Sequence, residues 1–143
     1  MFSKACEYGI KAMIIIAQDL KGNQWVSLKE IAGKINSPVA FTAKILQILS
    51  REGLLLSSKG ASGGFQLSAP AREINLAHIV IAIDGNGVFT KCGLGLEQCN
   101  SLKPCPVHFK FSKVREQLAE MMYNTNLEEL SKGLKEGMSY LKV

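Results

Sequence analysis

The sequence predicts a mainly α-helical fold that includes one small β-hairpin. Apolar residues recur at helical spacing in several segments, and most of these segments begin beside a residue that commonly caps helices. A glycine-rich stretch, 59–64, lies between two short apolar runs and has the composition of a hairpin turn. With 143 residues, 47% of them hydrophobic, the chain can bury one compact core but is too short for two large domains.

Three helices are expected before the hairpin. The first spans Ser3–Leu20 and carries one buried stripe. The second begins at Ser27, which has the spacing of a capping box to Glu30. A tight turn at Asn36-Ser37-Pro38 leads almost directly into the third helix, which ends at Gly53. The stripe of the first helix comprises Tyr8, Ala12, Ile15, Ile16 and Leu20.

The order of these elements indicates a winged helix-turn-helix. In that fold the second helix of the pair lies in the major groove of DNA, and the hairpin, or wing, approaches the backbone or the minor groove. The strands are expected at Leu54–Ser57 and Phe65–Leu67, with the positive charge of Lys59 on the turn between them. A helical pair alone is common in all-α proteins, so the hairpin that follows it is what favours DNA binding. The residues expected to contact DNA are Ser27, Thr42, Ala43, Lys44, Gln47, Arg51, Lys59, Gly60, Ser62 and Gly63.

The charge distribution agrees with a nucleic-acid partner. The formal net charge is +5. Residues 1–64 carry eight Lys and Arg against four Asp and Glu, whereas residues 65–143 carry nine against eight. A basic first half beside a nearly neutral second half suggests that the first half meets a polyanion, although basic patches are also common on ordinary surfaces.

The sequence is expected to contain neither a secretory signal nor a membrane-spanning segment. The apolar run 12–17 is too short to cross a bilayer and lies inside a helical pattern with polar residues, so we expect a cytoplasmic protein with no membrane partner. In that reducing compartment structural disulfides are disfavoured, and clustered cysteines indicate metal binding or redox chemistry instead.

The second half of the chain is expected to hold a loop and a longer helix. A short helix at Leu76–Ile83, capped by Asn75, is followed by a stretch from 85 to 106 without periodicity. From about Val107 to Asn124 runs a helix whose apolar face suits either a two-fold partner helix or its own domain. A short capped helix beginning at 125–128 and a polar tail follow. The apolar face comprises Phe111, Val114, Leu118 and Met121 or Met122.

From these predicted elements, the chain is expected to divide into three parts. Residues 1–84 form the expected winged helix-turn-helix DNA-binding domain, residues 85–106 a cysteine-bearing loop, and residues 107–143 a dimerisation helix with a C-terminal helix and tail.

The cysteines of the loop carry a candidate metal site. Six residues separate Cys92 from Cys99, five separate Cys99 from Cys105, and two separate Cys105 from His108. Three thiolates and an imidazole can complete a four-ligand site for an iron–sulfur cluster or for zinc, and bare redox-active thiols are the third interpretation. Structural zinc sites usually contain Cys-x-x-Cys pairs, which this loop lacks. Cys6 lies outside the loop and is expected to be a small buried helix residue.

Six segments of the chain resemble the Rrf2 family of bacterial transcription regulators, whose members include a regulator of iron–sulfur cluster assembly and a nitric-oxide-sensing repressor. The wing, from Lys59-Gly60 to Gly63-Gly64-Phe65, is the most specific of these segments. The resemblance implies a homodimer that crosses through the long helix and places two recognition heads on double-stranded operator DNA. The resembling segments are Ser3–Ala17, Val26–Ala32, Phe41–Leu55, Lys59–Leu67, Ile74–Gly85 and Thr125–Leu130.

The resemblance also implies a sensor. Several family members hold an iron–sulfur cluster on three loop cysteines, so Cys92, Cys99 and Cys105 are expected to hold one here, with [2Fe–2S] favoured over [4Fe–4S]. The fourth ligand is expected to be His108, or alternatively Glu7 of the partner subunit. The expected function is a DNA-binding transcription regulator that senses redox state, nitric oxide or iron–sulfur status, and not an enzyme. The alternative is a cluster-free regulator controlled by a partner protein or by thiol oxidation.

The chain departs from its relatives in two places. Ala40 and Ala43 stand where the cluster-assembly regulator has polar residues that read DNA, and alanine can contact a thymine methyl group but cannot hydrogen-bond a base edge. The first cysteine spacing is one residue longer than is common in that regulator. The operator sequence of a relative therefore cannot be carried over to this chain.

Overall fold

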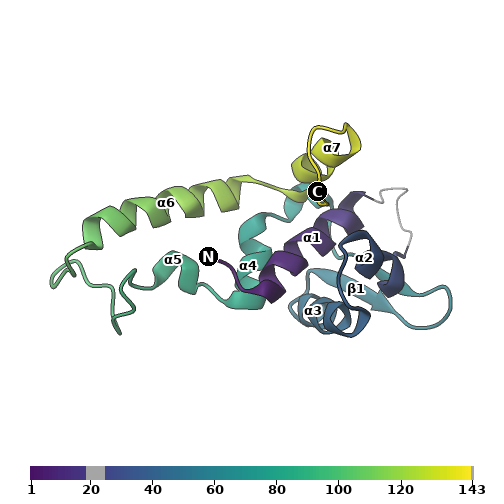
Figure 1. Ribbon diagram of the computed structural model, residues 1–143, viewed down its shortest axis with the longest axis horizontal. Helices are drawn as coiled ribbons and strands as arrows, with labels where there is room; N and C mark the ends of the chain where they lie inside the picture. The colour runs from purple at the N-terminus through teal and green to yellow at the C-terminus, as the bar shows by residue number, and fades with distance from the viewer. Residues whose placement is uncertain (19–24, 143) are drawn as a thin grey trace.

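The computed structural model describes residues 1–18 and 25–142 and confirms a mainly helical chain with one two-stranded antiparallel hairpin (Figure 1). No helix in these two ranges combines the length and the hydropathy needed to cross a membrane. The elements in chain order are α1 (Lys4–Gln18), α2 (Leu28–Lys34), α3 (Val39–Arg51), β1 (Leu55–Ser58), β2 (Gly64–Leu67), the 3-10 turn η1 (Ala71–Glu73), α4 (Leu76–Asp84), α5 (Gly87–Thr90), α6 (His108–Asn124) and α7 (Leu127–Lys135).

Helix α1 is the centre of the core. The six successive residues 12–17 are all buried, because α3, α4 and α7 pack around the helix on several sides. The expectation of a single buried stripe was therefore wrong for this part of α1: a helix that is apolar all round is enclosed rather than amphipathic. Tyr8 lies at the less buried end and packs edge-on against Phe41 of α3, with 5.6 Å between ring centroids. The expected end of the helix at Leu20 lies outside the described residues.

Helices α2 and α3 form the expected helix-turn-helix. The Ser27 hydroxyl accepts a hydrogen bond from the Glu30 backbone N–H at 3.2 Å, which caps α2. The Glu30 carboxylate lies 3.1 Å from Lys34 Nζ, so it forms an ion pair along the helix instead of completing the capping box. Asn36, at φ 52°, makes the sharp turn into α3, which begins just after Pro38.

In the wing, formed by β1, β2 and the turn between them, β1 lies one residue later than the sequence suggested, whereas β2 begins one residue earlier and ends at the predicted Leu67. Its register pairs Leu55 with Leu67 and Ser58 with Gly64. An unpredicted third partner is Val26, whose N–H donates to the Phe65 carbonyl at 2.9 Å and whose carbonyl accepts from the Phe65 N–H at 2.8 Å. Gly64, at φ 148°, permits this approach because a Cβ there would overlap the Val26 carbonyl. The wing is thereby fastened to the segment that leads into α2.

Helices α4 and α7 begin side by side. Asn75 and His78 form a reciprocal capping box: Asn75 Oδ1 accepts from the His78 N–H at 2.9 Å, and the Asn75 N–H donates to His78 Nδ1 at 3.2 Å. The Leu76 N–H donates to the Thr125 carbonyl at 3.0 Å, which ties the start of α4 to the segment before α7. His78 is thus an exposed residue that caps α4.

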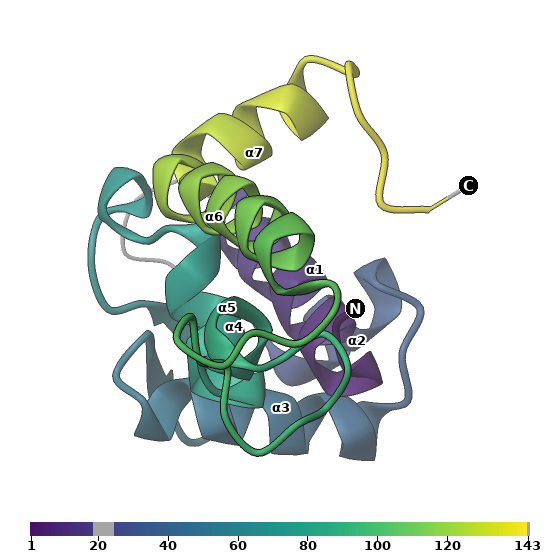
Figure 2. The same cartoon turned by 90° about the vertical axis from the view of Figure 1, so that its left-hand side faces the viewer.

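Helix α6 runs as an arm along α4 and α5 toward one end of the molecule (Figures 1 and 2). The cysteine loop (residues 85–106) lies at the outer end of this arm, whereas the wing lies at the opposite end of the long axis. The loop is not entirely without regular structure, because Gly87–Thr90 form the short helix α5. Helix α6 begins one residue later than predicted and ends at the predicted Asn124, and α7 begins within the predicted segment 125–128.

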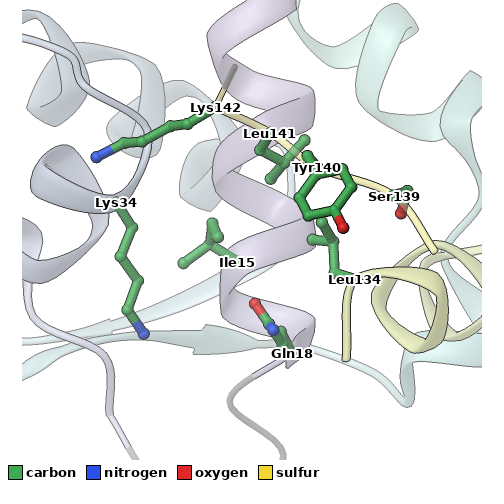
Figure 3. A pocket seen from close by; sticks show the side chains of 8 residues that line it. All are labelled: Ile15, Gln18, Lys34, Leu134, Ser139, Tyr140, Leu141 and Lys142. Carbon is green, nitrogen blue, oxygen red and sulfur yellow. The ribbon is translucent and has the colours of Figure 1, made fainter. Parts of the chain in front are cut away.

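The tail returns to the first helix of the helix-turn-helix. Lys142 Nζ donates a hydrogen bond to the Gly33 carbonyl near the end of α2 at 2.7 Å. Between the tail, α1, α2 and α7 lies a shallow pocket of about 380 Å³, and the Lys142 side chain at its edge reaches toward α2 (Figure 3). The pocket is lined by Ile15, Gln18, Lys34, Leu134, Ser139, Tyr140, Leu141 and Lys142.

Candidate DNA interface and cysteine centre

The outer face of α3 presents a row of polar and basic side chains. Lys44, Gln47 and Arg51 are exposed, at a spacing of three and four residues that places them on one side of the helix. The opposite side, with Ile45, Leu46 and Leu49, is buried against the core. Ala43 lies half-buried beside the exposed row. Helix α3 is therefore held by its apolar face and leaves the other face open to a ligand.

Thr42 does not belong to this open face, and its expected contact with DNA was wrong. The residue is fully buried, and its hydroxyl donates to the Pro38 carbonyl at 2.8 Å. The spacing contained the signal, because Thr42 precedes the buried Ile45 and Leu49 by three and seven residues and so lies on their side of the helix.

The tip of the wing is open to solvent. Lys59, Gly60 and Ser62 are exposed there, as the DNA-binding expectation requires. Gly63 is half-buried, and a Cβ at that position would overlap the Ser58 carbonyl. The tight turn itself thus requires a glycine at 63, whether or not this residue approaches DNA.

A groove of about 490 Å³ joins the wing to α2 and α3. Ser27 and Lys29 line it from α2, and Val39 lines it from the start of α3. The Ser27 oxygen accepts the capping hydrogen bond, which leaves the hydroxyl proton available to a phosphate. Lys29 is a cation that the sequence analysis did not single out, and it lies beside the residues that were expected to contact DNA. The remaining lining residues are Leu28, Ser58, Gly60, Ala61, Gly63, Gly64 and Phe65.

The structure places the four predicted donors in two close pairs. Cys92 Sγ lies 3.8 Å from Cys105 Sγ, and Cys99 Sγ lies 3.3 Å from His108 Nδ1. Cys92 and His108 are each 8% exposed, and the other two are half-buried. All four cysteines are free thiols. The two members of each pair are therefore close to each other, and a common centre for all four donors stays a prediction.

The pair geometry suits some metal centres better than others. Two sulfurs bound tetrahedrally to one metal at about 2.3 Å lie roughly 3.8 Å apart, which is close to the Cys92–Cys105 separation. Within residues 1–18 and 25–142, no group of three or more His, Cys, Asp or Glu side chains is placed to hold a metal ion. A [2Fe–2S] cluster takes two protein ligands on each of its two irons, so a donor set made of two pairs fits it.

Backbone groups stabilise the first thiolate of the loop. The Leu94 N–H donates to Cys92 Sγ at 3.4 Å. Hydrogen bonds from the backbone of Leu94 and then of Leu96 lower the pKa of Cys92 below its ordinary value. A thiolate is both the metal-binding and the nucleophilic form of cysteine, so this arrangement suits either metal binding or thiol chemistry.

Arg115 of α6 is a further residue of this centre that sequence reasoning missed. Its Nη2 donates to Cys99 Sγ at 3.1 Å, and its Nη1 donates to the Lys91 carbonyl at 2.7 Å. Nothing in the local sequence marks the residue, because the contacts join positions 16 and 24 residues apart.

Glu7 and Cys6 stand apart from the two donor pairs. The Glu7 carboxylate lies 3.1 Å from Lys4 Nζ in an ion pair on α1. Cys6 is fully buried, and burial, together with the nearby Asp84 carboxylate, raises its pKa to about 12. The expectation of a small buried helix residue at position 6 is confirmed. A ligand role for Glu7 of the partner subunit stays a prediction.

Comparison with known proteins gives consistent relatives. A putative HTH-type transcriptional regulator of Aquifex aeolicus is 28% identical over 132 residues, which cover 91% of this chain and 90% of that protein. The transcriptional regulator IscR of Vibrio campbellii is 26% identical over 125 residues, or 87% of this chain and 73% of that one. The structure of CymR, the global cysteine regulator of B. subtilis, superposes with a TM-score of 0.78 at 26% identity, covering 92% and 96% of the two chains.

The family model for Rrf2, described as an iron-dependent transcriptional regulator, matches residues 2–133. This match spans the helix-turn-helix, the wing, the cysteine loop and α6. With the winged-helix architecture and the relatives, it shows that the chain is a transcriptional regulator of the Rrf2 family and not an enzyme.

Proposed function

We propose that this regulator binds operator DNA as a homodimer, and that Cys92, Cys99, Cys105 and His108 hold an iron–sulfur cluster whose state sets operator affinity. The observation that carries the proposal is that the four donors form two close pairs, Cys92 with Cys105 and Cys99 with His108 of α6. A two-by-two donor set favours [2Fe–2S] over [4Fe–4S]. A bound cluster supplies a centre that changes charge on reduction and that oxidation or nitric oxide can remove.

The DNA-binding part of the proposal rests on the exposed face of α3 and on the wing tip. Gln47 has the side chain suited to reading a base edge in the major groove, and Lys44 and Arg51 flank it with positive charge. Lys59 carries charge to the backbone or minor groove, and Ser27 and Lys29 face the groove between them. These side chains come from a rigidly packed head, which suits recognition of a fixed DNA shape.

The dimer rests on the apolar face of α6. Phe111, Val114 and Met121 are 41%, 56% and 47% exposed in the single chain, which is unusual for three apolar residues on one helix. Leu118 and Met122, by contrast, pack on the chain's own core, so only part of the stripe expected from the sequence is open to a partner. A two-fold contact through this face would place two heads on half-sites about ten base pairs, or a multiple of ten, apart.

A cluster-free thiol switch is the second candidate, favoured by the Cys92–Cys105 separation of 3.8 Å. Hydrogen peroxide would take two electrons and both thiol protons from this pair, so that the two sulfurs join in a disulfide and the peroxide leaves as two water molecules. The lowered pKa of Cys92 supplies the thiolate that begins such a reaction.

Anaerobic purification separates the two candidates. The cluster proposal predicts visible absorbance with iron and acid-labile sulfide, lost in Cys92→Ser, Cys99→Ser and Cys105→Ser but kept in the matched control Cys6→Ser. A colourless wild-type protein, or one that holds zinc, would overturn it. Formation of a Cys92–Cys105 disulfide with peroxide, mapped by mass spectrometry, would then support the thiol switch.

Operator binding is tested with a duplex that the wild-type protein selects from a randomised pool. Apo and cluster-loaded dimers are expected to differ in affinity for it, and equal affinity on every selected duplex would rule out sensing. Lys59→Ala is expected to weaken binding and to make the salt dependence shallower by about one phosphate contact. An unchanged salt slope with a loss that depends on the duplex would instead place Lys59 in a narrow minor groove.

A further inference from the structure

One face of α6 holds the cysteine loop at three successive positions. His108 contacts Cys99 at the first turn of the helix. The Phe111 ring packs so closely on the Gly93 backbone that a Cβ at position 93 would collide with it. Arg115 reaches the loop one turn further on. Residues 108, 111 and 115 have the spacing of one helical face, so the loop docks on a single stripe of the arm.

Arg115 differs from the other two because it binds two separate parts of the loop. One guanidinium nitrogen holds the Lys91 carbonyl, directly before Cys92, and the other holds the Cys99 sulfur. The planar, rigid fork of the guanidinium fixes the separation of these two acceptors. Since Cys92 belongs to one donor pair and Cys99 to the other, the same side chain sets how the two pairs lie relative to each other.

We propose that Arg115 is a positioning residue for the cysteine centre: it orients Cys99, and its charge raises the reduction potential of the bound cluster. The inference rests on the proposed function. A [2Fe–2S] centre with three thiolates and a neutral imidazole carries a negative charge, and one added electron increases that charge by one. A guanidinium hydrogen-bonded to a ligand sulfur stabilises the reduced form more than the oxidised form.

The test compares cluster-loaded wild type with Arg115→Gln, Arg115→Lys and the control Lys113→Gln. Lys113 is an exposed cation on the same helix, so the control removes an equal charge from α6. The midpoint potential is measured by titration with dithionite, which supplies the single electron, and followed by visible and electron paramagnetic resonance spectra. Arg115→Gln is expected to lower the midpoint and alter the spectrum of the reduced centre. Arg115→Lys should restore part of the midpoint shift but not the spectrum, because an ammonium cannot reproduce the two-point fork.

Cluster retention gives a second measurement. Loss of the cluster to a chelator is expected to be on the order of tenfold faster in Arg115→Gln, since residues that orient ligands affect metal affinity to this extent. A midpoint that is unchanged in Arg115→Gln, or lowered equally in Lys113→Gln, would overturn the potential-setting role.

Hydrogen exchange of the apo proteins keeps the proposal testable if Arg115→Gln takes up no cluster. Amides of residues 91–99 should exchange faster in Arg115→Gln than in wild type or Lys113→Gln, and equal rates would overturn the positioning role. A wild-type protein that takes up no cluster overturns the proposed function and the potential-setting role together. In that case the exchange experiment still decides whether Arg115 positions the loop.

Discussion

The two ends of the molecule are built differently. At the DNA-binding end, Ile45, Leu46 and Leu49 of α3 are 2% exposed or less, and backbone hydrogen bonds tie the wing to the segment before α2. At the other end, residues 93–98 of the cysteine loop are all exposed, and a few side chains of α6 hold the loop in place. Segments with few buried contacts open at low free-energy cost, whereas packed cores open only on global unfolding. The difference gives a fixed geometry to the helix-turn-helix end, which is proposed to read DNA, and allows easier rearrangement at the end that carries the loop thiols.

Cysteine labelling makes this comparison directly. In the apo protein, iodoacetamide should modify Cys92, Cys99 and Cys105 and spare Cys6 until the chain unfolds. A pKa raised from 9.0 to about 12 lowers the thiolate fraction of Cys6 on the order of a thousandfold at neutral pH, and burial slows its reaction further. Cys92, whose pKa is lowered, should keep its reactivity as the pH falls below the range in which an ordinary thiol reacts. Mass spectrometry of the labelled peptides checks both statements, and early labelling of Cys6 would contradict the closed core.

The raised pKa of Cys6 also predicts how the stability of the folded protein changes at high pH. Because the folded-state pKa of Cys6 lies above its unfolded value, the unfolded chain releases this proton first, so stability should fall as the pH rises from about 9 toward 12. Cys6→Ala should reduce this slope.

Two leucine substitutions compare how much each end contributes to the free energy of unfolding. Leu46→Ala removes a fully buried side chain and should lower the free energy of unfolding by about 2–5 kcal/mol. Leu96→Ala removes a side chain that is 54% exposed in the loop and should change it by less than about 0.5 kcal/mol. Urea denaturation measures both. Equal losses would mean that the loop is part of the cooperative core.

Helix α6, which joins the two ends of the molecule, is expected to form the contact between the two subunits of the proposed dimer. Val114→Glu places a charge in the exposed apolar face of α6 and should weaken self-association by about 2 kcal/mol or more, measured by sedimentation at several concentrations. Lys113→Glu, one position away on the helix, is the control for added negative charge. Val114 is a cleaner choice than Leu118, which packs on the core. A Val114→Glu protein that stays fully dimeric would show that another surface forms the dimer.

Within the rigid end, one exposed and one buried position of α3 should behave oppositely. Gln47→Ala should cost about 1–3 kcal/mol of discrimination between selected duplexes and leave stability unchanged, because the side chain is exposed. Thr42→Val should cost about 1 kcal/mol of stability, since it removes the hydrogen bond to Pro38, and leave base preference unchanged. A change of base preference in Thr42→Val would restore this residue to the DNA-facing set.

Local signals in the sequence predicted the elements well. Helical spacing and capping residues located α2, α3, α4, α6 and α7, because caps and periodicity act within a few residues. The enclosure of α1 was beyond such signals, since it depends on α7, more than 100 positions later in the chain. The Val26–Phe65 pairing and the Arg115 contacts were missed for the same reason. In the candidate site, spacing identified the four donors, but their division into two pairs came only from the folded loop.

The length of α6 has a mechanical consequence. Its 17 residues make a rod roughly 25 Å long, so a tilt of roughly 5° about one end moves the other by roughly 2 Å. The cysteine loop contacts the first turns of α6 through Cys99, and α4 packs along α6 closer to the helix-turn-helix. A displacement of that size is more than half of the roughly 3.4 Å rise between successive nucleotides of a DNA strand. In the proposed dimer, α6 would therefore act as a lever, and a small rearrangement of the loop would shift the two heads relative to the helical repeat of the DNA.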